Sequence, residues 1–368
     1  MRAFSHFLFP LTAMLLLLAG CGPAKERYVR MEGFAQGGTW HIISSLPAGA
    51  KPAAVRDSID RLLLEIDASL SGYNRGSLLS RLNAGADLPL DDHFLVNFRL
   101  SEQYWHESGG AFDPSAAPLF DLWGFGFKEA GAIPTKRQID SVRTFIGMDL
   151  FRIDTLGDGT FRLHKADPRC RLNFNAIAQG YTCDRVARYL DALGSSNYLV
   201  EVGREILCKG LSARGDKWKI AVETPAGGER YCEARIFSSE RSNNLGAEAE
   251  RSCNLGAETE RGNNLGAEAE RSCNLGAESG EIEISLQDTL HLTDCAVVTS
   301  GDYRKYYVKD GRRYAHTIDP RTGSPVTHGL LSATVIIPFE SDSGRVQWAC
   351  ARADACATWS MVEGKVVR

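Results

Sequence analysis

Helical and strand patterns alternate irregularly along this chain, and that irregularity limits its possible folds more than any other feature. Between Pro52 and Leu70 the apolar residues recur at intervals of three and four, which predicts a helix with one buried face. A second helix is predicted from His93 to Glu107, where Gly109-Gly110 ends it, and a third from about Ala176 to Leu193, closed by Gly194. The segments that separate these helices have a different pattern.

Those other segments carry strand and turn signals. Phe151–Lys165 alternates on either side of a Gly-Asp-Gly turn, which predicts a β-hairpin, and short strands are predicted at Tyr198–Val202 and Trp218–Glu223. Thr135–Gln138 has the form of a capping box for one further helix, which we expect to end at Gly147. Because hairpins are mixed irregularly with helices, the sequence predicts an α+β fold. We expect mixed or antiparallel sheets flanked by helices rather than a regular βαβ array.

The N-terminus is typical of a secreted protein. A basic start precedes the apolar run Phe7–Leu18, and Ala-Gly stands directly before Cys21, so residues 1–20 are predicted to be a signal peptide. The cut site resembles the lipobox of bacterial lipoproteins, in which Cys21 is lipidated. An ordinary signal peptide or a membrane anchor is the alternative. We expect a tether at 21–30, a lipid anchor in a bacterial membrane, and a domain at 31–368 that faces the periplasm or another exported side.

Residues 241–280 are a run of near-identical decapeptides. The sequence Arg-Ser-Asn-Asn-Leu-Gly-Ala-Glu-Ala-Glu begins at 241 and recurs with changes at 251, 261 and 271. Each copy offers one leucine and a few alanines, too little apolar surface to offset the entropy of ordering. We therefore predict a solvent-exposed insertion between two strands of a hairpin. Neutral expansion accounts for it more simply than a role in partner binding.

Several classes of function are excluded by what the sequence lacks. A formal net charge of −4 provides no basic field, so no nucleic-acid partner is expected. The cysteines after Cys21 form no C-x-x-C pair and have no zinc-site spacing. Neither a Walker loop, a G-x-G-x-x-G fingerprint, an H-E-x-x-H pair nor a G-x-S-x-G elbow is present.

Five groups of local patterns remain, and their order along the chain is distinctive. They are Gly37–Trp40, Ser71–Asn74, Gly109–Pro114, Leu172–Tyr181 at a strand-to-helix junction, and a C-terminal set of Thr299–Tyr303, His316–Gly323 and Asp354–Thr358. Together they resemble the ApbE family, the FAD:protein FMN transferases, over about 37–358 except at the repeats. The resemblance implies that 31–368 is a transferase domain of that fold.

A magnesium site follows from this resemblance. The family match implies that Mg²⁺ is held by the side chains of Asp354 and Thr358 and by the backbone carbonyl of Ala178. Oxygen ligands suit this cation, and residues four apart on a helix share one face. Without the other motifs, an aspartate cap and an ordinary helical threonine would be the simpler interpretation.

The resemblance also assigns a base and the flavin contacts. His316 is the expected general base, since an imidazole can take a proton from a hydroxyl near neutral pH. A structural histidine is the alternative role, and His328 is the rival candidate. The residues expected to contact FAD are Tyr73, which would stack on the flavin ring, and Ala111, Phe112, Asp113, Asn175, Tyr181 and Leu331.

The implied activity is Mg-dependent transfer of FMN from FAD to a threonine or serine of a partner protein, with release of AMP. The expected partner is a flavin-accepting subunit of a membrane redox complex. The alternatives are an FAD pyrophosphatase, a non-catalytic FAD-binding lipoprotein, and a damaged copy of the enzyme. Two positions differ from the family pattern: Gln179 stands where many members have lysine, and Arg204 replaces a usual glycine.

Overall fold

A computed structural model describes most of the chain between Arg27 and Val367. The described residues are 27–126, 133–223, 232–236, 286–303, 305–339, 348–365 and 367. The predicted signal peptide, Cys21 and the decapeptides at 241–280 lie outside these ranges. The first strand begins at Arg27, so residues 27–30 belong to the sheet and not to the predicted tether.

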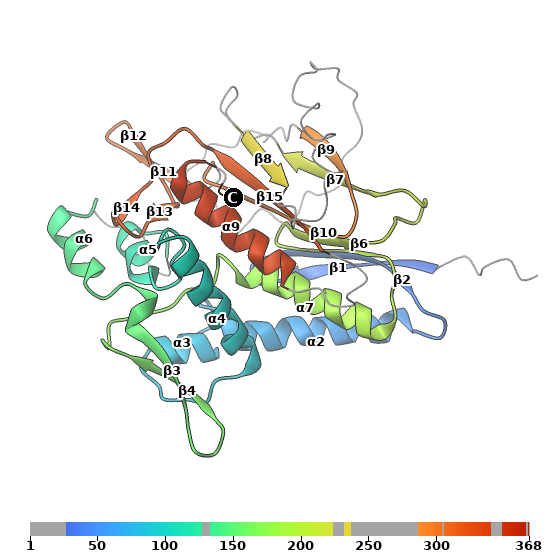
Figure 1. Ribbon diagram of the computed structural model, residues 1–368, viewed down its shortest axis with the longest axis horizontal. Helices are drawn as coiled ribbons and strands as arrows, with labels where there is room; N and C mark the ends of the chain where they lie inside the picture. Colours follow the sequence, from blue (N-terminus) through green and yellow to red (C-terminus); the bar gives the residue numbers. More distant parts are fainter. Residues whose placement is uncertain are drawn as a thin grey trace, which may run out of the picture.

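A seven-stranded sheet forms the centre of the fold (Figure 1). Its strands, in spatial order, are β1 (Arg27–Ala35), β2 (Gly38–Leu46), β5 (Tyr198–Val202), β6 (Glu205–Lys209), β10 (Cys295–Gly301), β15 (Ser332–Pro338) and β8 (Cys232–Ile236). All neighbours pair antiparallel except β15 and β8, which are parallel. The predicted α+β class with a mixed, largely antiparallel sheet is confirmed.

Long helices cover one face of this sheet (Figure 1). They are α2 (Pro52–Leu70), α4 (Asp92–Glu107), α7 (Ala178–Leu193) and α9 (Ala349–Glu363). Helix α7 packs on β5 and β6, and α9 packs on β10 and β15. The buried layer between them includes Trp40, Ile42 and Val200, and burying side chains of this size is the main source of stability.

A two-stranded ribbon of β7 (Trp218–Glu223) and β9 (Leu286–Leu292) packs on apolar residues of β6, β10 and β15. The decapeptides fall between β8 and β9 along the chain. Strand β9 pairs with β7, whereas β8 pairs with β15. The predicted hairpin flanking the insertion is therefore interrupted, because β8 leaves it to join the main sheet.

Shorter helices and two-stranded hairpins complete the fold. They are α3 (Leu78–Asn83), α5 (Ala117–Trp123), α6 (Lys136–Arg143), the 3-10 turn η1 (Met148–Leu150), and the hairpins β3 (Phe151–Thr155) with β4 (Phe161–Lys165), β11 (Tyr306–Lys309) with β12 (Arg312–Ala315), and β13 (Ile318–Asp319) with β14 (Ser324–Pro325). No helix among the described residues combines the length and apolar character required to cross a bilayer.

Local sequence patterns correctly predicted the start of helix α6 but not its end. The capping box of Thr135 and Gln138 is present at the start of α6. The same helix ends at Arg143 and not at Gly147, whose N–H donates to the Ser115 hydroxyl at 2.6 Å. Gly147 therefore contacts Ser115, which is distant in the sequence, and does not cap the helix as predicted.

Candidate functional site

The first turn of α7 and the first turns of α9 are in direct contact. A Cβ at Gly180 would lie 2.4 Å from the carbonyl oxygen of Cys350, so only glycine permits this approach. The Gly180 N–H donates to Asp354 Oδ2 at 3.3 Å. The carboxylate of Asp184 accepts the N–H groups of Cys350 and Ala351 at 3.0 and 2.9 Å. These contacts bring the predicted residues of the α7 motif and Asp354 together.

Three buried carboxyl groups cluster at this junction. Burial, with the nearby charge of Asp184, raises the pKa of Asp354 to about 7, and burial raises the pKa of Asp184 to about 7. Burial and the charge of Asp354 also raise the pKa of Glu205 well above its usual range. The Oε2 atom of Glu205 is buried without a hydrogen-bond partner among the described residues. Sequence analysis missed Glu205, because nothing local marks its burial beside Asp354.

This donor set fits a hard divalent cation. Burying several carboxylates close together is costly, and a bound cation would offset that cost. Within the described residues, no group of three or more His, Cys, Asp or Glu side chains has metal-binding geometry. A cation here would therefore complete its shell with backbone oxygen, hydroxyl oxygen and water, as Mg²⁺ commonly does.

The other two predicted metal ligands lie on the same two helices. Ala178 is the first residue of α7, and its carbonyl accepts a hydrogen bond from the Thr182 hydroxyl at 2.7 Å. A cation at this carbonyl would share it with that hydroxyl. Thr358 is half-buried on α9, one turn after Asp354.

His316 follows β12 and is oriented by main-chain contacts. Its Nδ1 lies 3.2 Å from the Lys305 carbonyl oxygen, which can only accept, so Nδ1 carries the proton and the basic lone pair is on Nε2. Burial and the positive charge of Lys305 lower the pKa of His316 to about 4. The imidazole is therefore neutral near pH 7 and able to accept a proton.

The rival histidine is differently placed. His328 Nε2 lies 2.6 Å from the Met361 carbonyl oxygen on α9, so Nε2 is its protonated nitrogen. Its other nitrogen, Nδ1, is buried and has no hydrogen-bond partner among the described residues. A base must reach solvent or substrate, so the geometry favours His316 over His328.

Tyr73 and Asn175, which are 102 positions apart, meet at the surface. The Asn175 side-chain amide donates to the Tyr73 hydroxyl at 3.4 Å. The Tyr73 side chain is 63% exposed, which is unusual for so large a ring. An exposed aromatic ring in this position suits stacking on a planar ligand.

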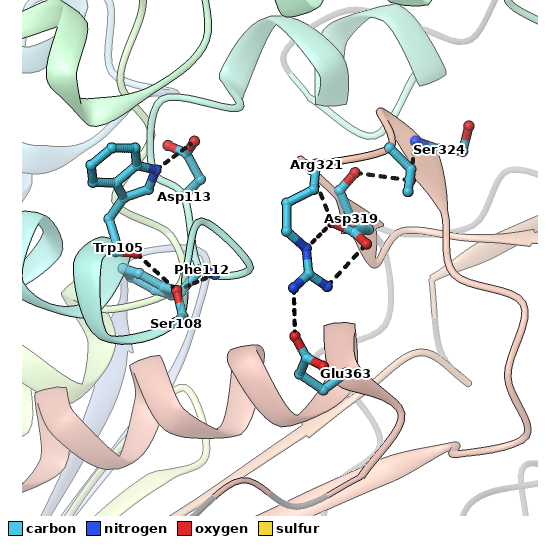
Figure 2. A network of polar contacts seen from close by, with 9 residues as sticks. Trp105, Ser108, Phe112, Asp113, Asp319, Arg321, Ser324 and Glu363 are labelled. Atoms are coloured by element: carbon cyan, nitrogen blue, oxygen red, sulfur yellow. Dashed lines mark hydrogen bonds and ion pairs between the residues drawn. The ribbon is translucent and has the colours of Figure 1, made fainter.

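The Gly109–Pro114 segment lies beside the segment that follows His316. A Cβ at Gly110 would lie 3.5 Å from Trp105 Nε1 and 3.9 Å from Arg321 Cγ. Figure 2 shows the Arg321 guanidinium between Asp319 and Glu363, at 2.9 and 2.7 Å, near the end of α9. The tertiary structure thus joins two motifs that are about two hundred residues apart.

The predicted contacts Ala111, Phe112 and Asp113 are largely covered. Ala111 and Phe112 are each 1% exposed, and their N–H groups donate to the Ser108 carbonyl and hydroxyl at 3.3 and 3.0 Å, so neither residue is open to a ligand here. Asp113 accepts from the Trp105 indole at 3.2 Å (Figure 2). It also accepts from the Ser115 N–H at 2.8 Å. Burial raises the pKa of Asp113 to about 6.

Two further predicted contacts have internal partners. Tyr181 is fully buried, stacks on Trp348, and its hydroxyl lies 2.8 Å from His93 Nδ1. The structure thus places Tyr181 in the core, where its ring is not exposed to a ligand. The Leu331 carbonyl accepts the N–H of Asp302 at 3.0 Å, which ties the strand after His328 to the Thr299–Tyr303 motif.

Asp302 itself was not expected as a site residue. Its side chain is 4% exposed, and burial raises its pKa. Arg313 lies 3.6 Å from its carboxylate and donates to its carbonyl oxygen at 2.7 Å. This pair joins β10 to the hairpin that precedes His316.

Comparison with known proteins shows the family of this chain. The model of the ApbE family matches residues 37–244 and 259–367, so the unmatched 245–258 lie within the decapeptides. The chain is 30% identical over 358 residues to the FAD:protein FMN transferase of Vibrio cholerae, covering 96% of this chain and 86% of that one. It is also 30% identical over 334 residues to the protein of the same name from Haemophilus influenzae, covering 89% and 80%.

Solved structures give the same result. The apo flavinyl transferase ApbE of Pseudomonas stutzeri superposes with a TM-score of 0.67 at 28% identity, covering 93% of this chain and 86% of that one. The flavin transferase ApbE of Vibrio cholerae gives 0.66 at 28% identity, covering 92% and 87%. The chain is a member of the ApbE family, and with these relatives it belongs among the transferases.

Proposed function

We propose that this protein transfers the FMN part of FAD to a threonine or serine hydroxyl of a partner protein. The hydroxyl oxygen forms a bond to the FMN phosphorus, the bond from that phosphorus to the bridging oxygen breaks, and AMP leaves with the bonding electrons. The hydroxyl proton passes to a base. The single observation that carries this proposal is the α7–α9 junction, where Asp354 lies against the first turn of α7.

Phosphoryl transfer depends mainly on charge neutralisation and positioning. Asp354, Thr358 and the Ala178 carbonyl would hold magnesium, which supplies charge neutralisation at the diphosphate when bound. Gly180 and Asp184 fix the relation of α7 to α9 through the contacts of their backbone and carboxylate. The Oε2 atom of Glu205 is buried without a hydrogen-bond partner among the described residues, and a cation on the same side would favour the ionised form of this carboxyl group.

His316 is proposed as the base. Its Nδ1–H is held by the Lys305 carbonyl, so Nε2 is the nitrogen that would take the proton of the attacking hydroxyl. The lowered pKa of about 4 keeps this nitrogen unprotonated at neutral pH. Tyr73, with Asn175 beside it, is proposed to stack on the flavin ring.

The setting is part of the proposal. We infer that Cys21 is lipidated after removal of 1–20, and that the mature protein is anchored to a membrane on the exported side. The acceptor would then be a flavin-accepting subunit of a membrane redox complex. Metabolic labelling with a fatty acid tests the anchor: wild type should take up label, and Cys21→Ser should not.

One mixture tests the activity. Full-length protein in mild detergent is incubated with FAD, Mg²⁺ and a threonine-bearing acceptor protein, and the acceptor is weighed by mass spectrometry. A gain of one FMN group with an equal amount of AMP is expected. Free FMN with an unmodified acceptor would indicate a pyrophosphatase, and bound intact FAD without products would indicate a carrier.

A further inference from the structure

The turn between β5 and β6 holds an arginine in a backbone conformation that favours glycine. Val202 pairs with Glu205, so Gly203 and Arg204 form a two-residue hairpin turn. Their φ angles are 63° and 91°. A turn with positive φ at both positions normally takes glycine, asparagine or aspartate, because a larger side chain is strained there. Such strain persists at positions where the side chain has a functional role.

Arg204 lines a cavity between the main sheet and the β7 strand. The cavity has a volume of about 190 Å³, and its other lining residues include Glu201, Val222, Thr299, Gly301 and Tyr303. Since a water molecule occupies about 30 Å³ in the liquid, this space can admit a group as large as a phosphate. Three of the lining residues belong to the Thr299–Tyr303 motif. This motif contributes neither a proposed magnesium ligand nor the proposed base.

The same turn touches the start of α7. A Cβ at Gly203 would lie 2.1 Å from Gln179 Nε2, so the Gln179 amide packs directly over the turn. Gln179 is flanked by Ala178 and Gly180, the residues that face the proposed magnesium site. Glu205 follows Arg204, and the charge of Arg204 acts on it together with that of Asp354. The β5–β6 turn therefore contacts α7 through Gly203 and lines the cavity through Arg204.

We propose that Arg204 binds a phosphate group of the dinucleotide substrate in this cavity. A guanidinium is always charged and offers a planar fork of donors that matches phosphate oxygens. Glu201 lines the same cavity and the charge of Arg204 acts on Glu205, so both carboxyl groups would compete with an incoming anion. Gln179 is uncharged, so the positive charge at the contact between this turn and the start of α7 comes from Arg204.

This inference rests on the proposed function for its ligand, and binding measurements test it separately from catalysis. The full-length protein, Arg204→Gly, Arg204→Lys and the control Arg214→Gly are titrated with FAD at low and high salt, and their melting temperatures are measured. Arg214 is an exposed arginine in the turn after the other end of β6, and it is absent from the lining of the cavity. Its replacement changes the net charge by the same amount.

We expect Arg204→Gly to weaken FAD binding about tenfold or more, since a charge-assisted hydrogen bond is lost. The salt dependence of its Kd should become shallower. Its melting temperature should stay the same or rise, because glycine relieves the strained φ. Arg204→Lys should fall between the two, and Arg214→Gly should bind FAD like wild type.

An FAD Kd for Arg204→Gly within twofold of wild type would overturn the inference. A lower melting temperature with unchanged salt dependence would also overturn it, since the arginine would then act through the fold. If wild type binds FAD but transfers no FMN, the proposed activity is wrong. The role of Arg204 is then still decided by the ratio of the FAD Kd values of Arg204→Gly and wild type. A wild-type protein that binds no FAD would defeat both.

Discussion

The backbone N–H of Gly180 donates to the carboxylate of Asp354 at 3.3 Å, across a sequence separation of 174 residues. This contact joins the first turn of α7 to the second turn of α9. Only a residue without a side chain permits this contact, because a Cβ at Gly180 would lie 2.4 Å from the carbonyl oxygen of Cys350 on α9. The position of the carboxylate that is proposed to bind the metal therefore depends on one glycine in another helix.

Gly180→Ala should destabilise the protein by about 1–3 kcal/mol, because a buried methyl group would force the two helices apart. Denaturant unfolding measures this change. Gly157→Ala is the matched control, since its added Cβ meets nothing within 4 Å and should change stability little. Equal stability of the two variants would show that α7 and α9 are not packed this closely.

Asp354→Asn should remove stabilisation by Mg²⁺. A cation that binds only the folded state at a hundred times its Kd adds about 2.7 kcal/mol of stability. Wild type should therefore melt at a higher temperature in Mg²⁺ than in EDTA, and Asp354→Asn should not respond. Asp158→Asn, in the exposed β3–β4 turn, should respond like wild type. A response retained by Asp354→Asn would place the cation elsewhere.

The buried carboxyl of Asp354 should also make stability depend on pH in the absence of metal. Its folded pKa of about 7 is above the ordinary value of 3.8, so the unfolded state loses its proton first as pH rises. The folded state therefore loses stability between about pH 4 and pH 7. In EDTA at pH 8, Asp354→Asn should be more stable than wild type by about 2–4 kcal/mol. At pH 4 the difference should be small, and a larger difference there would contradict the assignment.

His316→Ala should abolish FMN transfer while FAD binding changes little, because the base acts on the acceptor hydroxyl. A lost general base typically lowers the rate by about 10²–10⁴-fold. His164→Ala, an exposed histidine of β4, is the matched control and should remain active. Because the pKa of His316 is lowered to about 4, protonation of this residue should not slow transfer until the pH approaches 4. A loss of activity centred near pH 6.5 would indicate a different base.

Tyr73→Ala should weaken FAD binding with little change in stability. The ring is 63% exposed, so its removal opens no cavity in the core, and stacking on an aromatic ring is worth about 0.5–1.5 kcal/mol beyond area burial. Flavin fluorescence titration measures the affinity. Phe34→Ala, which removes a ring that is 70% exposed on β1, should leave the affinity unchanged.

The sequence by itself determined the elements whose information is local. The apolar spacing of 52–70 matched helix α2 residue for residue, and the Gly-Asp-Gly turn matched the β3–β4 hairpin. Asp354 and Thr358 lie on one helix, α9, where a spacing of four residues places them one turn apart. These features depend on neighbours within a few residues, which the sequence contains explicitly.

Only the tertiary structure decided which side chains are buried, which buried groups lie close enough to change each other's pKa, and which residues hydrogen-bond across the chain. It buried Tyr181 against Trp348, placed Glu205 beside Asp354, and fixed the tautomer of His316 through Lys305. In the folded protein Gly147 does not end helix α6, and its N–H donates instead to the Ser115 hydroxyl. Each outcome depends on a partner that adjacent residues do not specify, and burial and hydrogen bonding act through space and not along the chain.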